Sequence, residues 1–586
     1  MKKLIILSFI LFTLYFLPAD THIPSGDVSG TWTIDGSPYI IDGYITVPID
    51  STLIIEPSVF VIFSTNNGMQ IEGRLLSEGT ENDSIIFTVQ DSSNNTGLGF
   101  YHTDITNQDS SKITYSIFEH VSVCFDKSSN ILFRKSSVSN CVGWSGVFFD
   151  ENSSPTLKDI IISNNTTDYY GGGIYCTNSS NPSITNVIVS ENSATWGGGI
   201  SCRFNSNPTL ENVNIINNGA IGAGGGIFCE ESSPSINNVI IDGNEGSGIC
   251  CTDESSPTLN NVTISNNNNG IGCFNSSPIL NNVIISGNSG GGIYSEGTGN
   301  ILLQDFIITG NNSLSMGGGV AVLGADMIMV NGRVAYNHAD DAGGIYCHNG
   351  VNLSLTNVTV SENSVDAGGI VGGIGCEFDC NLNITNSIVW NNAPMDIFLY
   401  GYGCESDITY SDIGGEGWQG EGNINTDPLF ADDEFHLLEG SPCIDAGNPD
   451  SLYYDIEDPY NPGYALYPAM GTILNDMGTY GGHGYYEPPV SIDNYELHPA
   501  TAGYELYNYP NPFNPRTTIQ FSNEQNQQNE QMKIEIYNIK GQKIDEIAIS
   551  NQQSTVSWNA EGFASGIYLY KLNIKDSPIK KMILLK

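Results

Sequence analysis

Asn186-Val-Ile-Val-Ser-Glu-Asn192 is one of ten copies of a seven-residue phrase that lie between residues 159 and 392. Each copy starts with Asn or Asp, continues with mostly apolar residues on either side of a variable one, and ends with Asn. Successive copies lie 21 to 29 residues apart. A constant phrase inside a variable period predicts that each copy is one coil of a solenoid, with the length differences confined to the turns.

Two columns of Asn frame the phrase. The first column is Asp159, Asn186, Asn212, Asn238, Asn261, Asn282, Asp305, Asn331, Asn357 and Asn386. The second column is Asn165, Asn192, Asn218, Asn244, Asn267, Asn288, Asn311, Asn337, Asn363 and Asn392. Apolar residues change parity at the first column, so we expect the chain to bend there in the left-handed conformation that Asn tolerates. Stacked Asn amides are expected to hydrogen-bond from coil to coil, so we interpret both columns as scaffold rather than as a ligand groove.

The positions between the columns separate core from surface. The third position after the first column is always Ile or Val and is predicted to face the core: Ile162, Val189, Ile215, Ile241, Ile264, Ile285, Ile308, Val334, Val360 and Val389. The position before it includes Asn214 and Arg333 among several Ile residues, and is predicted to face outward. This outward stripe reflects β propensity, or a face that is covered or binds a partner. Three short strands in parallel register per coil would form a parallel β-helix.

Composition agrees with a turn-rich β protein: the chain has 66 Gly in 586 residues and only 14% charged residues. Its 19 basic and 64 acidic residues give a formal net charge of -45. Such a surface repels phosphate backbones, so we expect no nucleic-acid partner. Calcium is the candidate cofactor, although acidic runs such as Asp432-Asp-Glu434 lack an ordered ligand spacing.

The N-terminus reads as a secretory signal. Met1-Lys2-Lys3 precedes a mainly apolar run from Leu4 to Leu17, which is followed by Pro18-Ala19. The run is too short to span a bilayer comfortably, and we expect cleavage near Ala19. No other stretch resembles a transmembrane helix, so the mature chain is predicted to have no transmembrane span.

Most of the 13 cysteines belong to the repeat, three residues after a Gly. They are Cys176, Cys202, Cys229, Cys251, Cys273, Cys347 and Cys376. We interpret this column as a stack of small buried hydrophobes. The alternative is that coils about 4.8 Å apart bring some pairs within disulfide range. Cys404 and Cys443, outside the column, form a separate candidate pair.

Three segments carry a resemblance to a known class of proteins. Gly-Gly-Gly-Ile-Tyr-Cys at 171–176, the strand-rich segment 29–88 and Ser441-Pro-Cys-Ile-Asp-Ala-Gly447 resemble bacterial secreted right-handed parallel β-helix proteins of the pectate-lyase-like superfamily. The repeat is also similar to that of chlamydial polymorphic outer-membrane proteins. The resemblance covers roughly residues 29–484. It implies a fold and does not identify an activity.

The C-terminal segment carries a second resemblance. Tyr509-Pro-Asn-Pro-Phe-Asn-Pro515, Ile536-Tyr-Asn-Ile-Lys-Gly-Gln-Lys543 and Ala564-Ser-Gly-Ile-Tyr-Leu-Tyr-Lys571 are similar to the type A sorting domain of the type IX secretion system of Bacteroidota and related phyla. The resemblance implies export by that machinery to the outer-membrane surface or the exterior, often with removal of the domain. Strand-like runs in this segment predict a small Ig-like antiparallel sandwich.

The predicted protein is all-β, a right-handed parallel β-helix solenoid followed by the Ig-like sandwich. The predicted domains are the signal peptide 1–19, the N-terminal cap and first coils 20–110, the β-helix repeats 111–410, the C-terminal cap of the helix 411–484, a linker 485–503 and the sorting domain 504–586.

The strongest cluster of reactive side chains is His338-Ala-Asp340-Asp341 with Arg333 in the same coil. These are the candidate catalytic or metal-binding residues, and the alternative is a solvated acidic turn. A lyase needs Lys or Arg for proton abstraction and enolate stabilisation. Between residues 159 and 392 the only Lys or Arg residues are Arg203 and Arg333, which argues against such a site on the helix body.

Three functional hypotheses remain. The first is a non-catalytic adhesin or polysaccharide-binding rod on the cell surface, with a polysaccharide or another surface ligand as its partner. The second is a polysaccharide lyase or glycoside hydrolase on the same scaffold, and the third is a structural filament. Aromatic residues in turns, Tyr169, Tyr170 and Trp196, would either stack on sugar rings or pack the turns. Three or more polar and charged side chains that converge in one outward groove would favour the enzyme, above all a pair of carboxylates about 5–10 Å apart across a cleft near Asp340.

Overall fold

The computed structural model describes residues 20–64, 67–92, 96–102 and 110–483, and the segments 506–509, 516–521, 533–538, 543–549, 555–560, 562–563, 566–572 and 580–584. They divide into two compact units, Met1–Pro489 and Val490–Lys586. The predicted signal peptide 1–19 and linker 485–503 lie outside the described residues.

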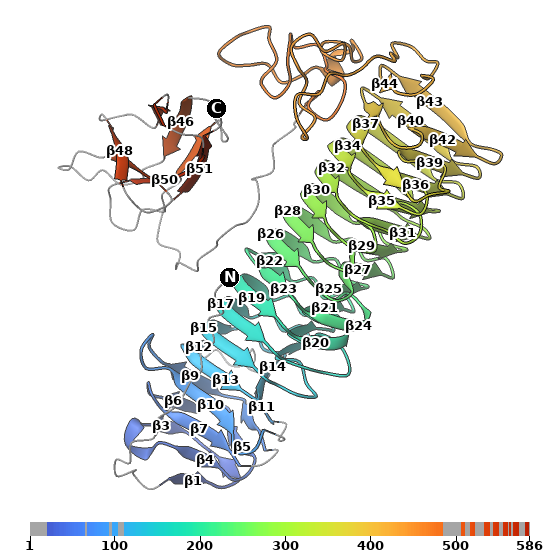
Figure 1. Cartoon of the computed structure of the whole chain (residues 1–586). Coiled ribbons are helices and arrows are strands. Elements are labelled where there is room, and N and C mark those ends of the chain that lie inside the picture. The colour runs from blue at the N-terminus through green and yellow to red at the C-terminus, as the bar shows by residue number, and fades with distance from the viewer. Residues whose placement is uncertain are drawn as a thin grey trace. The chain divides into compact units, whose positions relative to one another are not determined.

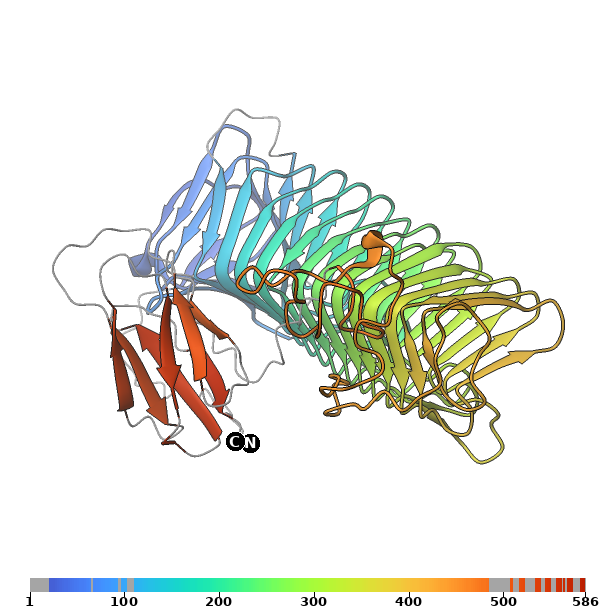
Figure 2. The same cartoon turned by 90° about the horizontal axis from the view of Figure 1, so that it is seen from above.

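The first unit is a parallel β-helix whose coils stack along one axis (Figures 1 and 2). One 16-stranded parallel sheet, which we call sheet B, takes one strand from each coil. Its strands are β2 (Gly26–Asp27), β5 (Ile45–Val47), β8 (Met69–Ile71), β11 (Thr96–Tyr101), β14 (Val121–Asp126), β16 (Val147–Asp150), β18 (Ile174–Cys176), β21 (Ile200–Arg203), β25 (Ile227–Glu230), β27 (Ser247–Thr252), β29 (Asn269–Phe274), β31 (Ile293–Glu296), β33 (Val320–Leu323), β36 (Ile345–His348), β39 (Ile374–Glu377) and β42 (Ile397–Tyr400).

The remaining strands of the coils form a 24-stranded sheet, sheet A. It contains the segments before and after the bend predicted at the first Asn column. Its strands are β1 (Thr21–Ile23), β3 (Gly30–Trp32), β4 (Tyr39–Ile41), β6 (Thr52–Ile55), β7 (Phe60–Phe63), β9 (Arg74–Glu78), β10 (Ile85–Val89), β12 (Ser111–Thr114), β13 (Ser116–Glu119), β15 (Ile131–Ser139), β17 (Thr156–Ser163), β19 (Ser183–Ser190), β22 (Thr209–Glu211), β23 (Asn214–Ile216), β26 (Ser235–Asp242), β28 (Thr258–Ser265), β30 (Ile279–Ser286), β32 (Asn300–Thr309), β34 (Asp326–Ala335), β37 (Asn352–Ser361), β40 (Asn381–Thr385), β41 (Ile388–Trp390), β43 (Glu405–Thr409) and β44 (Asp412–Ile413).

Short elements lie in the turns. Two pairs of parallel strands join neighbouring turns, β20 (Ser193–Trp196) with β24 (Gly219–Ala223) and β35 (His338–Ala339) with β38 (Ser364–Val365). Single 3-10 turns occur at η1 (Ile34–Gly36) and η3 (Ser451–Tyr453).

The bend predicted at the first Asn column is confirmed. All ten residues of the column have φ between 52° and 56°, the left-handed region. In β19, Ile184 is buried on one side of Asn186, and Val187 and Val189 are buried on the other. One strand therefore turns a corner at Asn186 and keeps its apolar side chains inside on both arms.

The second Asn column is a buried ladder. Its ten side chains are at most 5% exposed. The Nδ2 of each Asn donates to the Oδ1 of the next coil's Asn at 2.8–3.1 Å. The same Oδ1 also accepts the backbone N–H of the preceding Asn, as Asn244 Oδ1 does from Asn218 at 2.9 Å. The predicted amide stacking is confirmed, and the column forms no ligand groove because it is buried.

The ladder is closed at both ends. The first rung, Asn165 Oδ1, accepts the N–H of Cys141 at 3.0 Å. At the other end Asp396 Oδ1 accepts both the N–H and the Nδ2 of Asn392, at 2.9 and 2.8 Å. Burial raises the pKa of Asp396, although these two hydrogen bonds oppose the rise. A carboxylate can end the ladder because it only accepts, and so presents no N–H group that would need an acceptor beyond the last coil.

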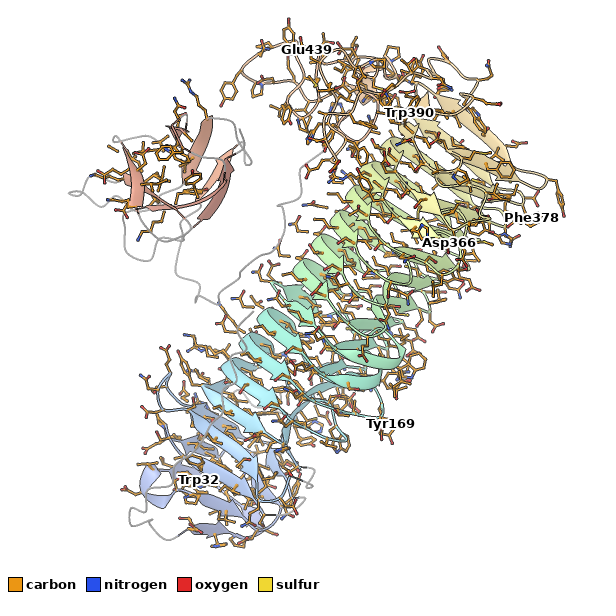
Figure 3. The ribbon with its side chains drawn as sticks, in the orientation of Figure 1. Trp32, Tyr169, Asp366, Phe378, Trp390 and Glu439 are labelled. Carbon is orange, nitrogen blue, oxygen red and sulfur yellow. The ribbon has the colours of Figure 1, made fainter. Side chains whose placement is uncertain are left out.

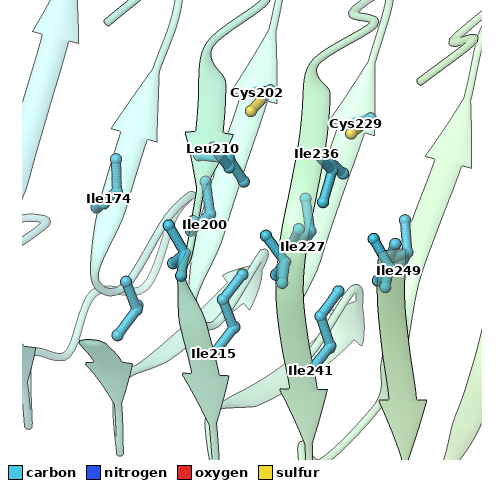
Figure 4. Packing of buried hydrophobic residues seen from close by; sticks show 14 of the residues in the cluster. Ile174, Ile200, Cys202, Leu210, Ile215, Ile227, Cys229, Ile236, Ile241 and Ile249 are labelled. Atoms are coloured by element: carbon cyan, nitrogen blue, oxygen red, sulfur yellow. The ribbon is translucent and has the colours of Figure 1, made fainter. Parts of the chain in front are cut away.

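The Cys column is the predicted stack of small buried side chains. All seven members are 0% exposed and belong to the hydrophobic core (Cys202 and Cys229 are drawn in Figure 4). Cys176, Cys202, Cys229, Cys251 and Cys273 are register partners on successive strands, as are Cys347 and Cys376. All 13 cysteines are free thiols. The candidate pair is not joined, because Cys443 Sγ contacts Asp412 Oδ2 at 3.3 Å and Cys404 Sγ contacts the carbonyl of Cys376 at 3.6 Å.

The predicted C-terminal cap lies along the outer face of sheet A (Figures 1 and 2). Thr479 donates its N–H to Thr359 Oγ1 at 3.0 Å, and Gly478 donates to the carbonyl of Asn386 at 2.8 Å. Thr359 and Ile388, both in the outward stripe, are therefore only 0% and 1% exposed. For the last coils, the expectation of a covered outward face is confirmed.

The second unit contains two antiparallel sheets. One comprises β45 (Leu506–Tyr509), β46 (Arg516–Phe521) and β49 (Thr555–Asn559), and the other β48 (Lys543–Ala548), β47 (Lys533–Asn538), β50 (Gly566–Leu572) and β51 (Lys580–Leu584). Ile519, Ile536, Trp558 and Tyr570, from both sheets, share one hydrophobic cluster. The unit is antiparallel β as predicted, and its Ig-like topology stays a prediction.

The ladder makes a strong prediction about stability. Asn244→Ala removes the acceptor of Asn218 and the donor to the carbonyl of Ile215, and it leaves buried polar groups without partners. We expect the free energy of unfolding to fall by about 3 kcal/mol or more, measured by chemical denaturation. Asn268→Ala, at an exposed position one residue after a ladder Asn, is the control and should cost less than about 0.5 kcal/mol. Equal costs for the two variants would contradict the ladder's role.

Two buried carboxyls make the cap sensitive to pH. Burial and then the nearby Asp476 raise the pKa of Asp455 to about 8, and burial raises the pKa of Asp476 to about 7. Both carboxyls ionise near pH 4 in the unfolded chain, so unfolding releases protons and the cap loses stability as pH rises from about 4 through 8.

Hydrogen exchange of residues 470–482, corrected for the intrinsic rate, measures this local stability. Protection should fall between pH 5 and 8.5, and Asp455→Asn should flatten the dependence. The exposed Asp340→Asn is the matched control. Protection that stays constant or rises with pH in the unmodified protein would refute the expectation.

Candidate functional site

The structure gives the predicted reactive residues separate partners. Arg333 donates to the carbonyl of Glu434 at 3.3 Å and to Tyr480 Oη at 3.2 Å, so its guanidinium holds the cap. His338 bonds instead to Ser364 and Asp366 of the next coil, at 3.0 and 3.1 Å. These contacts account for both basic groups without a shared site, and a catalytic role for them stays a prediction.

The two acidic members of the cluster also differ from each other. Asp340 is exposed, whereas Asp341 Oδ1 accepts the N–H groups of Ile370 and Val371 at 2.9 and 3.2 Å. Asp341 Oδ2 accepts from Tyr400 Oη at 2.9 Å. Burial opposes ionisation of Asp341, but these hydrogen bonds outweigh it and lower its pKa. Asp341 thus anchors the loop of the following coil.

A second polar cluster lies on the outer face of sheet B. Tyr346 Oη donates to Glu377 Oε2, and His348 Nδ1 lies 3.2 Å from the same oxygen. The His348 ring contacts Phe378 edge-on at 5.5 Å between centroids. Tyr346 is 6% exposed and its hydroxyl is already used by this contact, so the arrangement packs the surface of β36 and β39.

The outer face of sheet B is hollowed near its N-terminal end. The groove has a volume of about 430 Å³ and crosses β8, β11, β14 and β16. These strands are hydrogen-bonded neighbours in parallel register. Its size falls in the range of ligand sites.

Two glycines make the floor of this groove. In β11, Leu98 and Phe100 point into the core and are 0% exposed, so Gly97 and Gly99 occupy the outward positions between them. A Cβ on Gly97 would meet only the carbonyl of Ser122, at 3.3 Å. Two outward positions of β11 therefore have no side chain, while the inward positions still carry Leu98 and Phe100.

Aromatic side chains border the floor. Tyr44, Tyr101, Trp144 and Phe148 all line the groove. Trp144 is 61% exposed, and Tyr44 is held by a hydrogen bond from its Oη to Gln70 Oε1 at 2.8 Å. Burial raises the pKa of Tyr101 to about 12, so its hydroxyl remains a donor at neutral pH. Exposed aromatic faces around an open floor suit flat ligands with apolar ring faces.

Two carboxylates stand at one end of the groove. Asp126 and Asp150 are register partners on β14 and β16, so their backbones are about 4.8 Å apart. Asp150 Oδ1 accepts from Asn178 Nδ2 at 2.7 Å and from the N–H of Glu151 at 2.8 Å. Burial, then the nearby Glu151 and Asp150, raise the pKa of Asp126.

Sequence reasoning missed the groove because none of its residues lies in the ten-copy repeat. The alternation Gly97-Leu-Gly-Phe-Tyr101 is a usable signal, since it empties outward positions of a strand. Trp144 and Tyr44, however, come from turns of other coils, and only the stacking register brings them together.

The three aromatic turn residues, Tyr169, Tyr170 and Trp196, differ in whether they pack the turns or remain exposed for stacking on sugar rings. Tyr170 stacks on Tyr175 at 5.7 Å, and the Arg203 guanidinium lies 3.8 Å from its ring centroid. Trp196 packs against Phe228 at 5.4 Å. Tyr169 is 70% exposed at the outer edge of the coils (Figure 3). Turn packing thus occupies Tyr170 and Trp196, and sugar stacking stays a prediction for Tyr169.

Neither a metal cluster nor a membrane helix is found in the described part of the chain. No three His, Cys, Asp or Glu side chains are placed there to hold a metal ion together, so calcium stays a prediction from composition. No helix among those residues is long and apolar enough to cross a bilayer.

Comparison with protein families gives two matches. The family described as the right handed beta helix region matches residues 81–256 and 247–413. The family described as the secretion system C-terminal sorting domain matches residues 508–586. The chain therefore carries a type IX sorting domain and is exported to the cell surface or the exterior. A search among curated proteins gives no match.

Solved structures with a similar chain path include alginate epimerases. The periplasmic alginate epimerase AlgG is 12% identical over 61% of this chain and 77% of its own, with a TM-score of 0.25. A double mutant of AlgG is 10% identical over 62% of this chain and 78% of its own, with a TM-score of 0.31. The A-module of the mannuronan C-5 epimerase AlgE6 of Azotobacter vinelandii is 11% identical over 66% of this chain and 90% of its own, with a TM-score of 0.20. Likeness at this level carries no argument about activity.

Proposed function

Because this chain belongs to the right-handed β-helix family, we propose that it is a surface-displayed rod that binds a polysaccharide without cleaving it. Such a protein would act as an adhesin toward surfaces coated with that polysaccharide. The observation that carries the proposal is the groove on sheet B, with its glycine floor and its border of Tyr44, Tyr101, Trp144 and Phe148.

The groove has the features that sugar recognition requires. Aromatic faces provide apolar contact for the C–H surface of a pyranose ring at low cost in side-chain entropy. Carboxylate and hydroxyl groups at Asp126, Asp150 and Ser122 supply hydrogen-bond acceptors and donors for ring hydroxyls. The strands beneath are held in register by the coil-to-coil hydrogen bonds of sheet B, so the site is rigid before ligand binds.

The composition of the groove favours binding over β-elimination. The described residues that line it include no Lys, Arg or His. A lyase would need one such group, or a tyrosinate, to remove the α-proton and a cation to stabilise the enolate. Tyr101 is poorly suited to that role because burial raises its pKa to about 12.

Trp144→Ala tests the proposal directly. We expect it to weaken binding of oligosaccharides, identified on an array of neutral, amino and acidic glycans, by about tenfold, since an aromatic contact contributes about 1 kcal/mol or more. Calorimetry with the hexasaccharide that binds best measures the change. Tyr460→Ala, which removes a 94% exposed aromatic side chain outside the groove, should leave affinity unchanged.

Gly97→Leu is a second variant that fills the groove from below, and it should abolish binding while the core residues Leu98 and Phe100 stay in place. The proposal fails if the unmodified protein binds no glycan on the array. It also fails if both groove variants bind as the unmodified protein does.

The carboxylate pair favours a second candidate, a glycoside hydrolase. Glycosidases use two carboxyls whose environments separate their pKa values. Here burial and neighbouring negative charges raise the pKa of Asp126, and its register partner Asp150 accepts hydrogen bonds from Asn178 Nδ2 and the N–H of Glu151. Asp126 would be the acid and Asp150 the base or nucleophile.

This alternative predicts new reducing ends when the protein is incubated with a bound neutral or amino oligosaccharide. Asp126→Asn and Asp150→Asn should each lower the rate at least a hundredfold while both variants still bind the sugar. Binding without any release of reducing ends from the unmodified protein would exclude the hydrolase and leave the binding rod.

A further inference from the structure

The charge of the groove has one sign. Asp126 and Asp150 are the only Asp, Glu, Lys, Arg or His residues among the described residues that line it. In parallel register the two carboxylates lie on neighbouring strands about 4.8 Å apart, where like charges destabilise each other. The groove therefore has a local negative potential in addition to the net charge of -45 on the chain.

The charges next to this pair neutralise it only in part. Glu151 adds a negative charge beside Asp126 and Asp150. Lys127 and His102 also face Asp126 and act against the rise in its pKa, but burial and the two neighbouring carboxylates outweigh them. Lys127 Nζ is itself paired with Glu151 Oε2 at 2.5 Å.

Asp126 also has an unused hydrogen-bonding position. Its Oδ1 is buried, and no donor among the described residues contacts it. A buried acceptor without a donor costs about 1–3 kcal/mol, and native structures contain few of them. Because Oδ1 has no accessible surface, a ligand in the groove would reach this carboxylate through Oδ2, and a positive charge there would stabilise the carboxylate as a whole.

We propose that the groove selects a polysaccharide whose sugars carry free amino groups, with an ammonium group held between Asp126 and Asp150. This inference rests on the proposed polysaccharide-binding function and names its ligand class. An ammonium group brings three donors and a positive charge, so it can bond to the accessible carboxylate oxygens and relieve the repulsion between Asp126 and Asp150. The sugar rings lie against Trp144 and Tyr44, whose faces also attract cations.

The two competing ligand classes fit less well. A neutral or N-acetylated sugar offers donors to Asp126 but leaves the paired negative charges in place. A uronate polymer adds a third carboxylate to a site without a basic residue among the described lining, so repulsion excludes it. Selectivity should therefore follow the order amino sugar, neutral sugar, uronate.

The test uses the full chain and three hexasaccharides at pH 6.5 and low ionic strength, with calorimetry as the readout. They are β-1,4-linked glucosamine with free amines, its fully N-acetylated form, and a β-1,4-linked uronate. We expect the amine form to bind at least tenfold more tightly than the N-acetylated form, and the uronate not to bind. Raising the salt concentration should reduce the preference, because screening weakens charge pairing.

Substitutions distinguish the effect of the two groove carboxylates on ligand preference from the effect of the net charge of the chain. Asp126→Asn and Asp150→Asn should each lower the ratio of amine affinity to N-acetyl affinity at least fivefold, whatever their effect on the affinity for the N-acetylated hexamer. Asp253→Asn, which neutralises an exposed carboxylate outside the groove, should leave that ratio unchanged. A preference that persists in the Asp126→Asn, Asp150→Asn double variant would assign it to the net charge and overturn the inference.

The outcomes also distinguish this inference from the proposed function. Equal or tighter binding of the N-acetylated hexamer overturns the amino-sugar preference and leaves polysaccharide binding intact. If none of the three hexamers binds and the glycan array is also negative, the proposed function fails, and the inference fails with it.

Discussion

The structure depends on one repeated interaction, the hydrogen bond from each buried Asn to the Asn of the next coil. An amide can both donate and accept, so a column of amides satisfies itself indefinitely, and only its ends need other groups. Here those ends are the N–H of Cys141 and the carboxyl of Asp396. Because an interrupted ladder would bury unsatisfied groups, every coil from the one that holds Asn165 to the one that holds Asn392 must present Asn at the same place.

The ladder also determines what lies beside it. A Cβ on Gly199 would lie 2.6 Å from the carbonyl of Gly226 and 3.2 Å from Asn218 Nδ2, so the column that adjoins the amides must be glycine. The Ile and Cys columns then fill the remaining interior at a spacing set by the same coil-to-coil distance (Figure 4). With the interior so constrained, chemical variety is confined to outward positions and turns.

Two regions use that freedom in opposite ways. At the C-terminal end the cap covers the outward stripe, so Thr359 and Ile388 are buried and Arg333 serves as an anchor. At the N-terminal end Gly97 and Gly99 remove outward side chains, and a groove opens between aromatic residues and the Asp126–Asp150 pair. The same scaffold therefore holds a closed face and an open one, and the open one is the better candidate for ligand binding.

The fold followed from the sequence, because columns that recur in every coil reveal the bend at residues such as Asn186 and the core at residues such as Val189. The functional site did not. Gly97 signals an empty outward position, but Trp144 and Asp126 reach it from other coils of variable length, outside the repeat. The partners of His338 and Arg333 likewise depend on the next coil and on the cap. Local periodicity is written in the order of residues, whereas a surface site depends on the register between coils, which only the tertiary structure decided.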